Sequence, residues 1–130
     1  MISADLLLVA VGVGLGGALG ASARYLLDRF LPGGVLLANV LGSLLIGLLF
    51  GALDEVTTAD GPPPMHPALL AMISVGLLGA LSTFATVSLR AAQLWMRRRR
   101  LRAVGMWLAH AVLGLAAAVL GIWVGHLLMS

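Results

Sequence analysis

The stretch GGVLLANVLGSLLIGLLFGAL, residues Gly33–Leu53, runs for 21 residues without a charged side chain. A helix needs about 20 predominantly apolar residues to cross the hydrocarbon core of a bilayer. Lipid offers no water to the backbone, so a chain that crosses it must satisfy its own amide and carbonyl groups by forming a helix or a closed barrel. The stretch is therefore predicted to be a membrane-spanning helix.

Three further apolar stretches are also long enough to span a membrane. Short segments that contain charges and prolines separate them. We therefore expect an all-α membrane protein with a single four-helix transmembrane domain over residues 1–130, with helices at about 6–27, 33–53, 67–95 and 104–129. The first helix is expected to be retained rather than cleaved as a secretory signal, because its leader carries Asp5 and no basic residue.

The composition agrees with a membrane protein. Only 10% of the 130 residues are charged and 61% are hydrophobic, whereas a soluble domain has about 25% charged residues. The absence of cysteine excludes disulfides, thiol catalysis and cysteine metal sites. The sequence pI of about 11.2 reflects eight arginines, most of which lie in one run, so no nucleic-acid partner is expected.

The arginines lie on one side of the predicted membrane topology. With four spans, the first and third connections share a side, and all eight arginines lie in or near them: Arg24, Arg29, Arg90, Arg97, Arg98, Arg99, Arg100 and Arg102. Basic loops stay on the cytoplasmic side, so both termini are expected to face outward. The run Arg97–Arg100 is interpreted as a topology anchor, with contact to anionic lipid as the less favoured alternative.

Glycines recur at four-residue spacing in three of the spans: Gly12, Gly16 and Gly20, then Gly47 and Gly51, then Gly121 and Gly125. Small residues at this spacing let membrane helices approach closely. We interpret them as helix contacts. Four short helices enclose little interior volume, so a transport pathway is expected to need an oligomer.

The polar side chains inside the spans are neutral. No Asp, Glu or Lys lies in the middle of a span, which argues against a small proton-coupled multidrug exporter, because such a carrier needs a membrane-embedded carboxylate. Asn39 and Ser43 are four residues apart and share a helix face. A second polar group surrounds an aromatic ring in the third span: Ser82, Thr83, Phe84, Thr86 and Ser88.

Two interpretations of these neutral groups stay open. One is hydrogen bonding between helices, which is common for such residues in membranes. The other is a pathway for a small anion, bound by amide and hydroxyl donors and by the electropositive edge of a phenylalanine ring. The histidines predict no zinc site, because His110 and His126 lie sixteen residues apart in one span and face different ways. An effect of His110 titration on gating is the less favoured alternative to a structural role.

The segments GGALGASARY (Gly16–Tyr25), PGGVLLANVLGSLLIG (Pro32–Gly47) and GLLGALSTFAT (Gly76–Thr86) follow one another at characteristic spacing. In this order they resemble the motifs of the Fluc or CrcB family of fluoride channels. The resemblance implies an antiparallel, dual-topology-type dimer of four-helix subunits whose third helix is broken near its middle. It implies a passive, fluoride-specific channel, not an enzyme, that exports fluoride from the cytoplasm across a bacterial inner membrane and so reduces its toxicity.

The resemblance also assigns site residues. The expected anion pathway consists of Asn39, Ser43, Thr83, Phe84, Thr86 and Arg24. Asn39 matches a pore-facing asparagine of the second helix, and Phe84 matches the first phenylalanine of the third-helix motif. Arg24 matches a first-helix arginine that is expected either to attract anions to the cytoplasmic vestibule or to serve only as another topology charge.

A structural sodium ion at the dimer interface is implied as the one cofactor. Gly79 and Ser82 fall where the family breaks its third helix and offers backbone carbonyl oxygens to the ion. Oxygen ligands suit a hard cation. A carbonyl ligand does not depend on its side chain, so serine is tolerated where the family has threonine.

Several positions depart from the family pattern. Val87 replaces its second phenylalanine, Ala85 replaces a serine between the two, and Val35 replaces a second-helix threonine. In the fourth helix, Trp107 and Ala111 take the places of a tyrosine and a serine. Each donor lost along a dehydrated path leaves roughly 1–3 kcal/mol uncompensated. At least one pore of the dimer is therefore expected to be impaired.

The arginine bias of eight to zero predicts a single membrane orientation. Homodimeric members of the family insert in both orientations, as the resemblance implies for an antiparallel homodimer. We therefore expect, in preference to a homodimer, a heterodimer with an oppositely oriented homologue. In such a pair this chain is either a conducting subunit or a partly degenerate, non-conducting partner. Fluoride and membrane lipid are the other expected partners.

Overall fold

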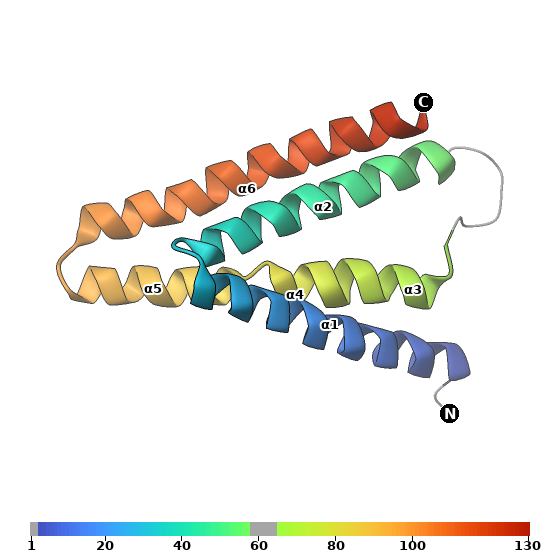
Figure 1. The fold of residues 1–130 in the computed structure, drawn as a ribbon, viewed down its shortest axis with the longest axis horizontal. Helices are drawn as coiled ribbons and strands as arrows, with labels where there is room; N and C mark the ends of the chain where they lie inside the picture. Colours follow the sequence, from blue (N-terminus) through green and yellow to red (C-terminus); the bar gives the residue numbers. More distant parts are fainter. Residues whose placement is uncertain (1–2, 58–64) are drawn as a thin grey trace.

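The structure is a computed structural model that describes residues 3–57 and 65–130. Within these ranges the chain consists of helices and short connections, with no strand (Figure 1). The helices are α1 (Ala4–Phe30), α2 (Gly34–Thr57), α3 (Pro67–Ala71), η1 (Met72–Leu78), α4 (Gly79–Leu81), α5 (Phe84–Met96) and α6 (Arg100–Met129). They form four segments that are long and apolar enough to cross a membrane: Ala4–Phe30, Gly34–Asp54, Pro67–Met96 and Arg100–Met129.

The second helix begins at Gly34, one residue later than predicted, because Gly33 lies in the turn between α1 and α2. Gly33 has a φ of +75°, which lies in the left-handed region that glycine adopts without strain. A methyl group at the next residue, Gly34, would collide with the backbone of Leu27. The two glycines therefore let the chain reverse direction within a few residues.

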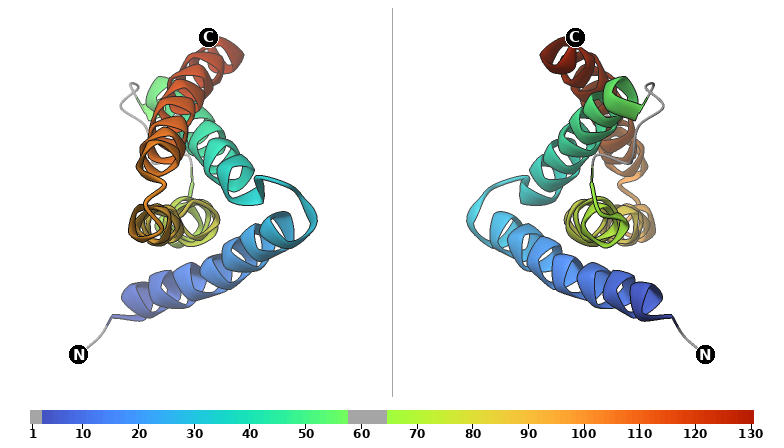
Figure 2. Two further views of the ribbon diagram at one scale, coloured as in Figure 1. Left: turned by 90° about the vertical axis from the view of Figure 1, so that its left-hand side faces the viewer. Right: turned by 90° about the vertical axis from the view of Figure 1, so that its right-hand side faces the viewer.

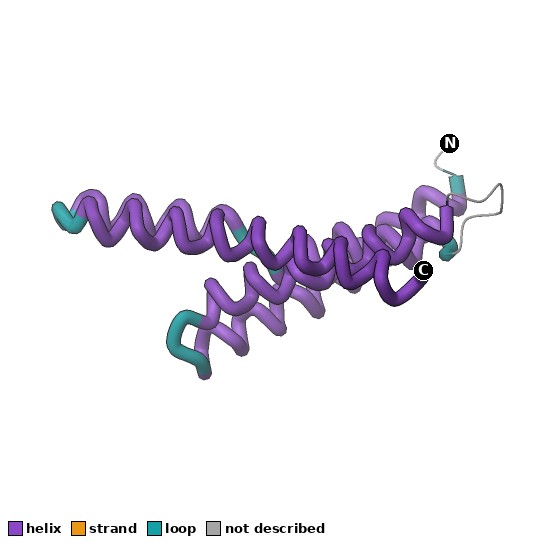
Figure 3. Tube along the Cα trace, turned by 90° about the horizontal axis from the view of Figure 1, so that it is seen from above, coloured by secondary structure: helices purple, strands orange, loops and turns teal. Residues whose placement is uncertain are grey.

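The helices pack in pairs. α2 and α6 lie side by side and run in the same direction (Figure 1, Figure 2). The third span changes its neighbour along its length, because α3, η1 and α4 contact α1 whereas α5 contacts α6. The start of α1 and the end of α6 lie at one end of the bundle, and the turns after α1 and α5 lie toward the other end (Figure 1, Figure 3).

The third span is irregular before it breaks. η1 is π-helical, a wider winding than the α-helix that is rare and usually found at functional positions. It approaches α1 closely, since a methyl group at Gly76 would lie 2.8 Å from the carbonyl oxygen of Val13. The expectation of a third helix broken near its middle is met after α4, where Ser82 and Thr83 have extended backbone angles.

Glycine backbones set the distance between the helices. A methyl group at Gly121 of α6 would lie 2.8 Å from the amide nitrogen of Leu48 in α2, and one at Gly16 of α1 would lie 2.9 Å from that of Leu77 in η1. The same crowding holds at Gly20, Gly47, Gly51 and Gly125. The interpretation of the spaced glycines as helix contacts is confirmed.

Side-chain caps fix the starts of α1 and α3. The hydroxyl of Ser3 accepts a hydrogen bond from the amide of Leu6 at 3.3 Å, at the start of α1. Nδ1 of His66 accepts one from the amide of Ala68 at 3.2 Å, and Pro67 takes the first helical position, where no amide donor is needed. His66 thus has a structural role.

The basic turn between α5 and α6 is exposed. Arg98 has a φ of 59°, which a non-glycine residue adopts only at a tight turn. The guanidinium carbon of Arg100 lies 5.1 Å from the ring centroid of Trp95, within the range of a cation–π contact. Together these features leave the arginine run on the surface at one end of the bundle.

Substitution of Gly121 by alanine is expected to lower the free energy of unfolding by roughly 1–3 kcal/mol, because the added methyl group forces α2 and α6 apart. Thermal unfolding of the detergent-solubilised protein, followed by circular dichroism, measures the effect. The matched control is Gly105→Ala in the same helix, where nothing lies within 4 Å of the added group. The control should be neutral or slightly stabilising; an equal loss in both variants would contradict close packing at Gly121.

Candidate functional site

The site begins at the break in the third span. Ser82 and Thr83 leave the helical conformation between α4 and α5, at a depth where no water is expected to reach the backbone. Unpaired backbone groups in an apolar environment are costly, so they need partners elsewhere in the protein. Asn39 of α2 provides them.

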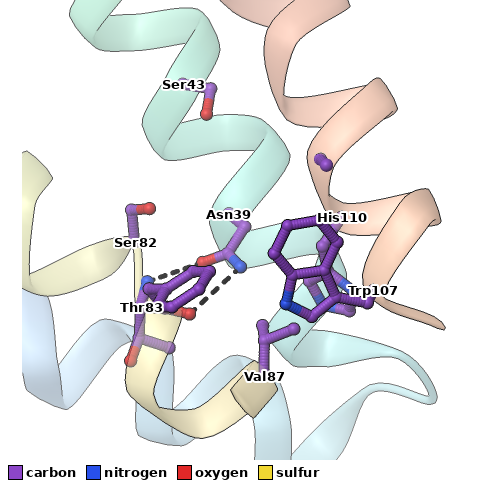
Figure 4. A pocket seen from close by; sticks show the side chains of 9 residues that line it. Asn39, Ser43, Ser82, Thr83, Val87, Trp107 and His110 are labelled. Atoms are coloured by element: carbon purple, nitrogen blue, oxygen red, sulfur yellow. Dashed lines mark hydrogen bonds between the residues drawn. The ribbon is translucent and has the colours of Figure 1, made fainter. Parts of the chain in front are cut away.

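The amide of Asn39 pairs with the backbone of Thr83 in both directions (Figure 4). Its Oδ1 accepts a hydrogen bond from the Thr83 amide at 2.7 Å, and its Nδ2 donates one to the Thr83 carbonyl at 3.3 Å. Asn39 is only 8% exposed. The side chain therefore satisfies the broken backbone much as a neighbouring strand would, and hydrogen bonding between helices is the interpretation that the contacts of Asn39 bear out.

The same break redirects hydrogen bonds away from two carbonyl groups. In a continuous helix the Thr83 amide would donate to the carbonyl of Gly79, but it donates to Asn39 instead. The Thr86 amide would donate to the carbonyl of Ser82, but it donates to Oγ1 of Thr83 at 3.3 Å, which caps α5. Gly79 itself lies within α4 rather than at the break. Both carbonyl groups expected to hold sodium have thus lost their helical donors, which fits an oxygen site for a hard cation.

A cavity of about 190 Å³ lies beside this break. It is lined by Asn39, Ser43, Ser82, Thr83, Phe84, Val87, Trp107, His110 and Ala111. The first two side chains come from α2 and the last three from α6, so the cavity lies where the second, third and fourth spans meet (Figure 4). Its wall combines amide and hydroxyl groups with aromatic rings.

The aromatic part of the wall is formed by Phe84 and Trp107. Their ring centroids are 6.0 Å apart and the ring planes meet at 80°, an edge-to-face contact. Phe84 is nevertheless 69% exposed. A large apolar ring at the edge of the cavity thus remains uncovered by this single chain.

A second cavity, of about 260 Å³, adjoins the first. Val87 and His110 line both, and the second extends to Arg90 and to the start of α2. Nδ1 of His110 lies 2.9 Å from the carbonyl oxygen of Met106. Its Nε2 is fully enclosed and has no hydrogen-bond partner among the described residues.

Arg90 belongs to an ion pair that connects α1 with α5. One guanidinium nitrogen donates to both carboxylate oxygens of Asp28, at 2.9 and 2.7 Å. Both side chains are partly exposed, so the pair contributes little to stability by itself. Its effect is to offset the charge of Arg90 beside the second cavity.

The structure brings together most of the expected anion pathway. Asn39, Ser43, Thr83 and Phe84 line the first cavity. Thr86 instead contacts Thr83, with the two hydroxyl oxygens 3.3 Å apart.

Arg24 and His110 depart from the expected layout. Arg24 lies half-buried on α1 and lines neither cavity. His110, for which the sequence favoured a structural role, does line both; its position three residues after Trp107 is the signal that could have placed it on the same helix face.

A profile of the family described as "CrcB-like protein, Camphor Resistance (CrcB)" matches residues 11–122. The chain belongs to the CrcB family. It is 39% identical over 121 residues to a protein of Paracoccus denitrificans (strain Pd 1222) named "Fluoride-specific ion channel FluC", an alignment that covers 88% of this chain and 91% of that protein. The resemblance in the three sequence motifs is thereby confirmed at the level of the family.

Two other CrcB relatives with the same name have a higher percentage identity over a shorter alignment. One, of Pseudoalteromonas translucida (strain TAC 125), is 45% identical over 85 residues, 59% of this chain. Another, of Shewanella sp. (strain ANA-3), is 46% identical over 92 residues, 65% of this chain. The chain spans just under two thirds of these two proteins, 66% and 65%. All three relatives are named as ion channels, in agreement with a multi-pass membrane protein that is not an enzyme.

Replacement of Asn39 by alanine is expected to lower the free energy of unfolding by roughly 1–3 kcal/mol, because it leaves the amide and carbonyl of Thr83 buried without partners. The matched control is Ser43→Ala, one turn along the same face of α2 and lining the same cavity. Thermal unfolding in detergent should separate the two variants. Equal stability of both would show that the Asn39 contacts do not hold the break together.

Proposed function

We propose that this chain is a subunit of a passive channel through which fluoride leaves the cytoplasm of a bacterial cell across its inner membrane. The observation that carries the proposal is the cavity beside Asn39 and Phe84, where hydrogen-bond donors and an aromatic edge meet inside a membrane-spanning bundle. The names of the three relatives support the choice of fluoride.

The cavity offers what a dehydrated small anion needs. The Asn39 amide has two N–H groups and gives one of them to Thr83, so the other is available to an anion. Ser43 adds a hydroxyl donor, and the ring edge of Phe84 carries partial positive charge. None of the described residues that line the cavity is acidic. The described lining therefore offers an anion hydrogen-bond donors and no negative charge that would repel it.

The same lining disfavours a proton-coupled exporter. Such a carrier exchanges protons for a cation at a carboxylate within the membrane, and the acidic residues with described side chains are Asp5, Asp28 and Asp54, all exposed near helix ends. Passive movement needs no such group. The channel is the function that these residues support best.

A second subunit is part of the proposal. Phe84 is 69% exposed in the middle of a span, and one chain leaves the cavity open on this side. An antiparallel partner would cover the ring and complete the pathway. The carbonyl groups of Gly79 and Ser82 have lost their helical donors. Their oxygen atoms would bind a sodium ion between the subunits, since oxygen ligands suit a hard cation.

The favoured partner is an oppositely oriented homologue. All eight arginines lie toward one side of the topology, and the chain has no lysine. This charge bias favours a single orientation. Ala85, Val87 and Ala111 offer no donor where the family pattern has polar or aromatic groups. These features support a heterodimer with one working pore, and they leave a non-conducting partner subunit as the second candidate.

Fluoride efflux from liposomes, followed with a fluoride electrode, tests the function. The chain alone is expected to give little or no efflux, and addition of a homologue with the opposite charge bias is expected to restore it. Robust efflux from the chain alone would contradict the heterodimer and leave the channel intact. In the conducting assembly, Phe84→Ala should lower flux about tenfold or more, because the lost ring contact raises the barrier for a dehydrated ion.

Phe50→Ala is the matched control for this experiment, because Phe50 is also exposed in a span but lines neither cavity. Normal flux in both variants, with normal assembly, would favour the non-conducting subunit.

Single cysteines introduced at Ser3 and Ser130 test the orientation, because the chain has no cysteine of its own. A membrane-impermeant maleimide added to intact spheroplasts is expected to label both positions. A cysteine at Arg99, in the basic turn, should react only after the membrane is permeabilised. Partial labelling at all three positions would indicate two orientations and support a homodimer.

A further inference from the structure

The two cavities meet at a single polar side chain. Val87 and His110 are the residues common to both linings. An ion that moves from Arg90 in the second cavity toward Asn39 in the first therefore passes between a valine and a histidine. Valine has no hydrogen-bonding group, so any specific contact at this step comes from His110 (Figure 4).

The neighbour of His110 indicates which ring nitrogen carries the hydrogen. Nδ1 lies 2.9 Å from the carbonyl oxygen of Met106, and a carbonyl only accepts hydrogen bonds, so Nδ1 carries the hydrogen. In the neutral ring Nε2 then presents a lone pair. This atom is the one that is enclosed and has no partner among the described residues.

The two states of the ring act oppositely on an anion. The lone pair of the neutral ring repels it, whereas the Nε2–H of the imidazolium donates a charge-assisted hydrogen bond to it. Inside a membrane an imidazolium together with an anion is neutral overall, and burying this pair is less costly than burying either ion alone. Occupancy by the anion and protonation of His110 are therefore expected to favour each other.

The geometry points to His110 as an anion subsite between the two cavities, occupied when Nε2 carries a proton. This inference rests on the proposed fluoride channel and deepens it. As fluoride enters, Nε2 takes up one proton from hydronium, which forms its N–H bond, and donates a hydrogen bond to the ion; as fluoride leaves, this bond breaks and the proton returns to water. No covalent bond to fluoride forms, and the channel conducts better as the pH falls.

The surroundings permit the charged ring. On α2 and on α6 the residues that line the two cavities are otherwise neutral, as are those of the break. On α5 the one charged group is Arg90, whose guanidinium donates to Asp28 of α1 at 2.7 Å. This pairing offsets the positive charge that would otherwise oppose protonation of His110.

The first test compares fluoride efflux from liposomes that hold the conducting assembly, between roughly pH 8 and about pH 6, after subtraction of the leak from protein-free liposomes. Flux should rise about five- to tenfold as the pH falls, because a single protonation switches the subsite on. His110→Gln keeps a neutral donor and should abolish this pH dependence, and His110→Phe should give low flux at every pH. His126→Gln is the control, because His126 lies in the last turn of the same helix and lines neither cavity.

The second test does not need conduction. A variant with His66→Asn and His126→Gln leaves His110 as the one histidine, and asparagine can replace the cap of α3. The imidazole is titrated by ¹⁵N NMR in detergent, with sodium fluoride or with sodium chloride. Fluoride should raise the pH midpoint of the titration, and chloride should raise it less.

The outcomes separate this inference from the proposed function. Fluoride efflux with the same pH profile in wild type and in His110→Gln would overturn the subsite and leave the channel standing. A fluoride-dependent titration in a chain that does not conduct in any assembly would support the subsite and overturn the channel. A titration that fluoride does not move, with wild-type flux independent of pH, would also overturn the subsite.

Discussion

A backbone that leaves the helix inside a membrane has to find its hydrogen bonds without water, and most of this site follows from how that requirement is met. The Asn39 side chain pairs with both backbone groups of Thr83. With Thr83 held in an extended conformation, its hydroxyl is free to cap α5. The cap sets where α5 begins, and thereby places Phe84 at the edge of the cavity opposite Trp107.

The break also joins the two halves of the bundle. Before it, α3, η1 and α4 pack on α1; after it, α5 packs on α6, which in turn lies along α2. Asn39 reaches the break from α2, so one amide ties the second span to the point where the third changes neighbour. The ion pair of Asp28 with Arg90 makes a second connection, from α1 to α5. The cavities lie between these two connections, where helices are held near one another but not packed in full.

Much of this could be predicted from the sequence, because it depends on local composition. Length and hydropathy predicted the four spans, and the spacing of Gly16 with Gly20 and of Gly121 with Gly125 predicted helix contacts. For Asn39 the residue type predicted hydrogen bonding inside the membrane but not its partner, which lies 44 residues away.

The remaining features could not be predicted because they depend on tertiary placement. The pairing of Asp28 with Arg90 spans 62 residues. His110 could be assigned to a helix face, but the enclosure of its Nε2 depends on how α2 and α5 surround it. η1 is largely apolar and shows no regular polar face, so its sequence does not show how it winds.

The winding of η1 sets the rotational phase of everything that follows it. A π-helical turn holds about one residue more than an α-helical turn, so it takes up a residue that in an α-helix would advance the downstream chain around the axis by about 100°. If the same residues 72–78 wound as an ordinary α-helix, the span would stay apolar and long enough to cross the bilayer. Thr83 and Phe84 would nevertheless be turned away from α2. The rotational phase that η1 sets is thus as much a part of the site as the side chains that line it.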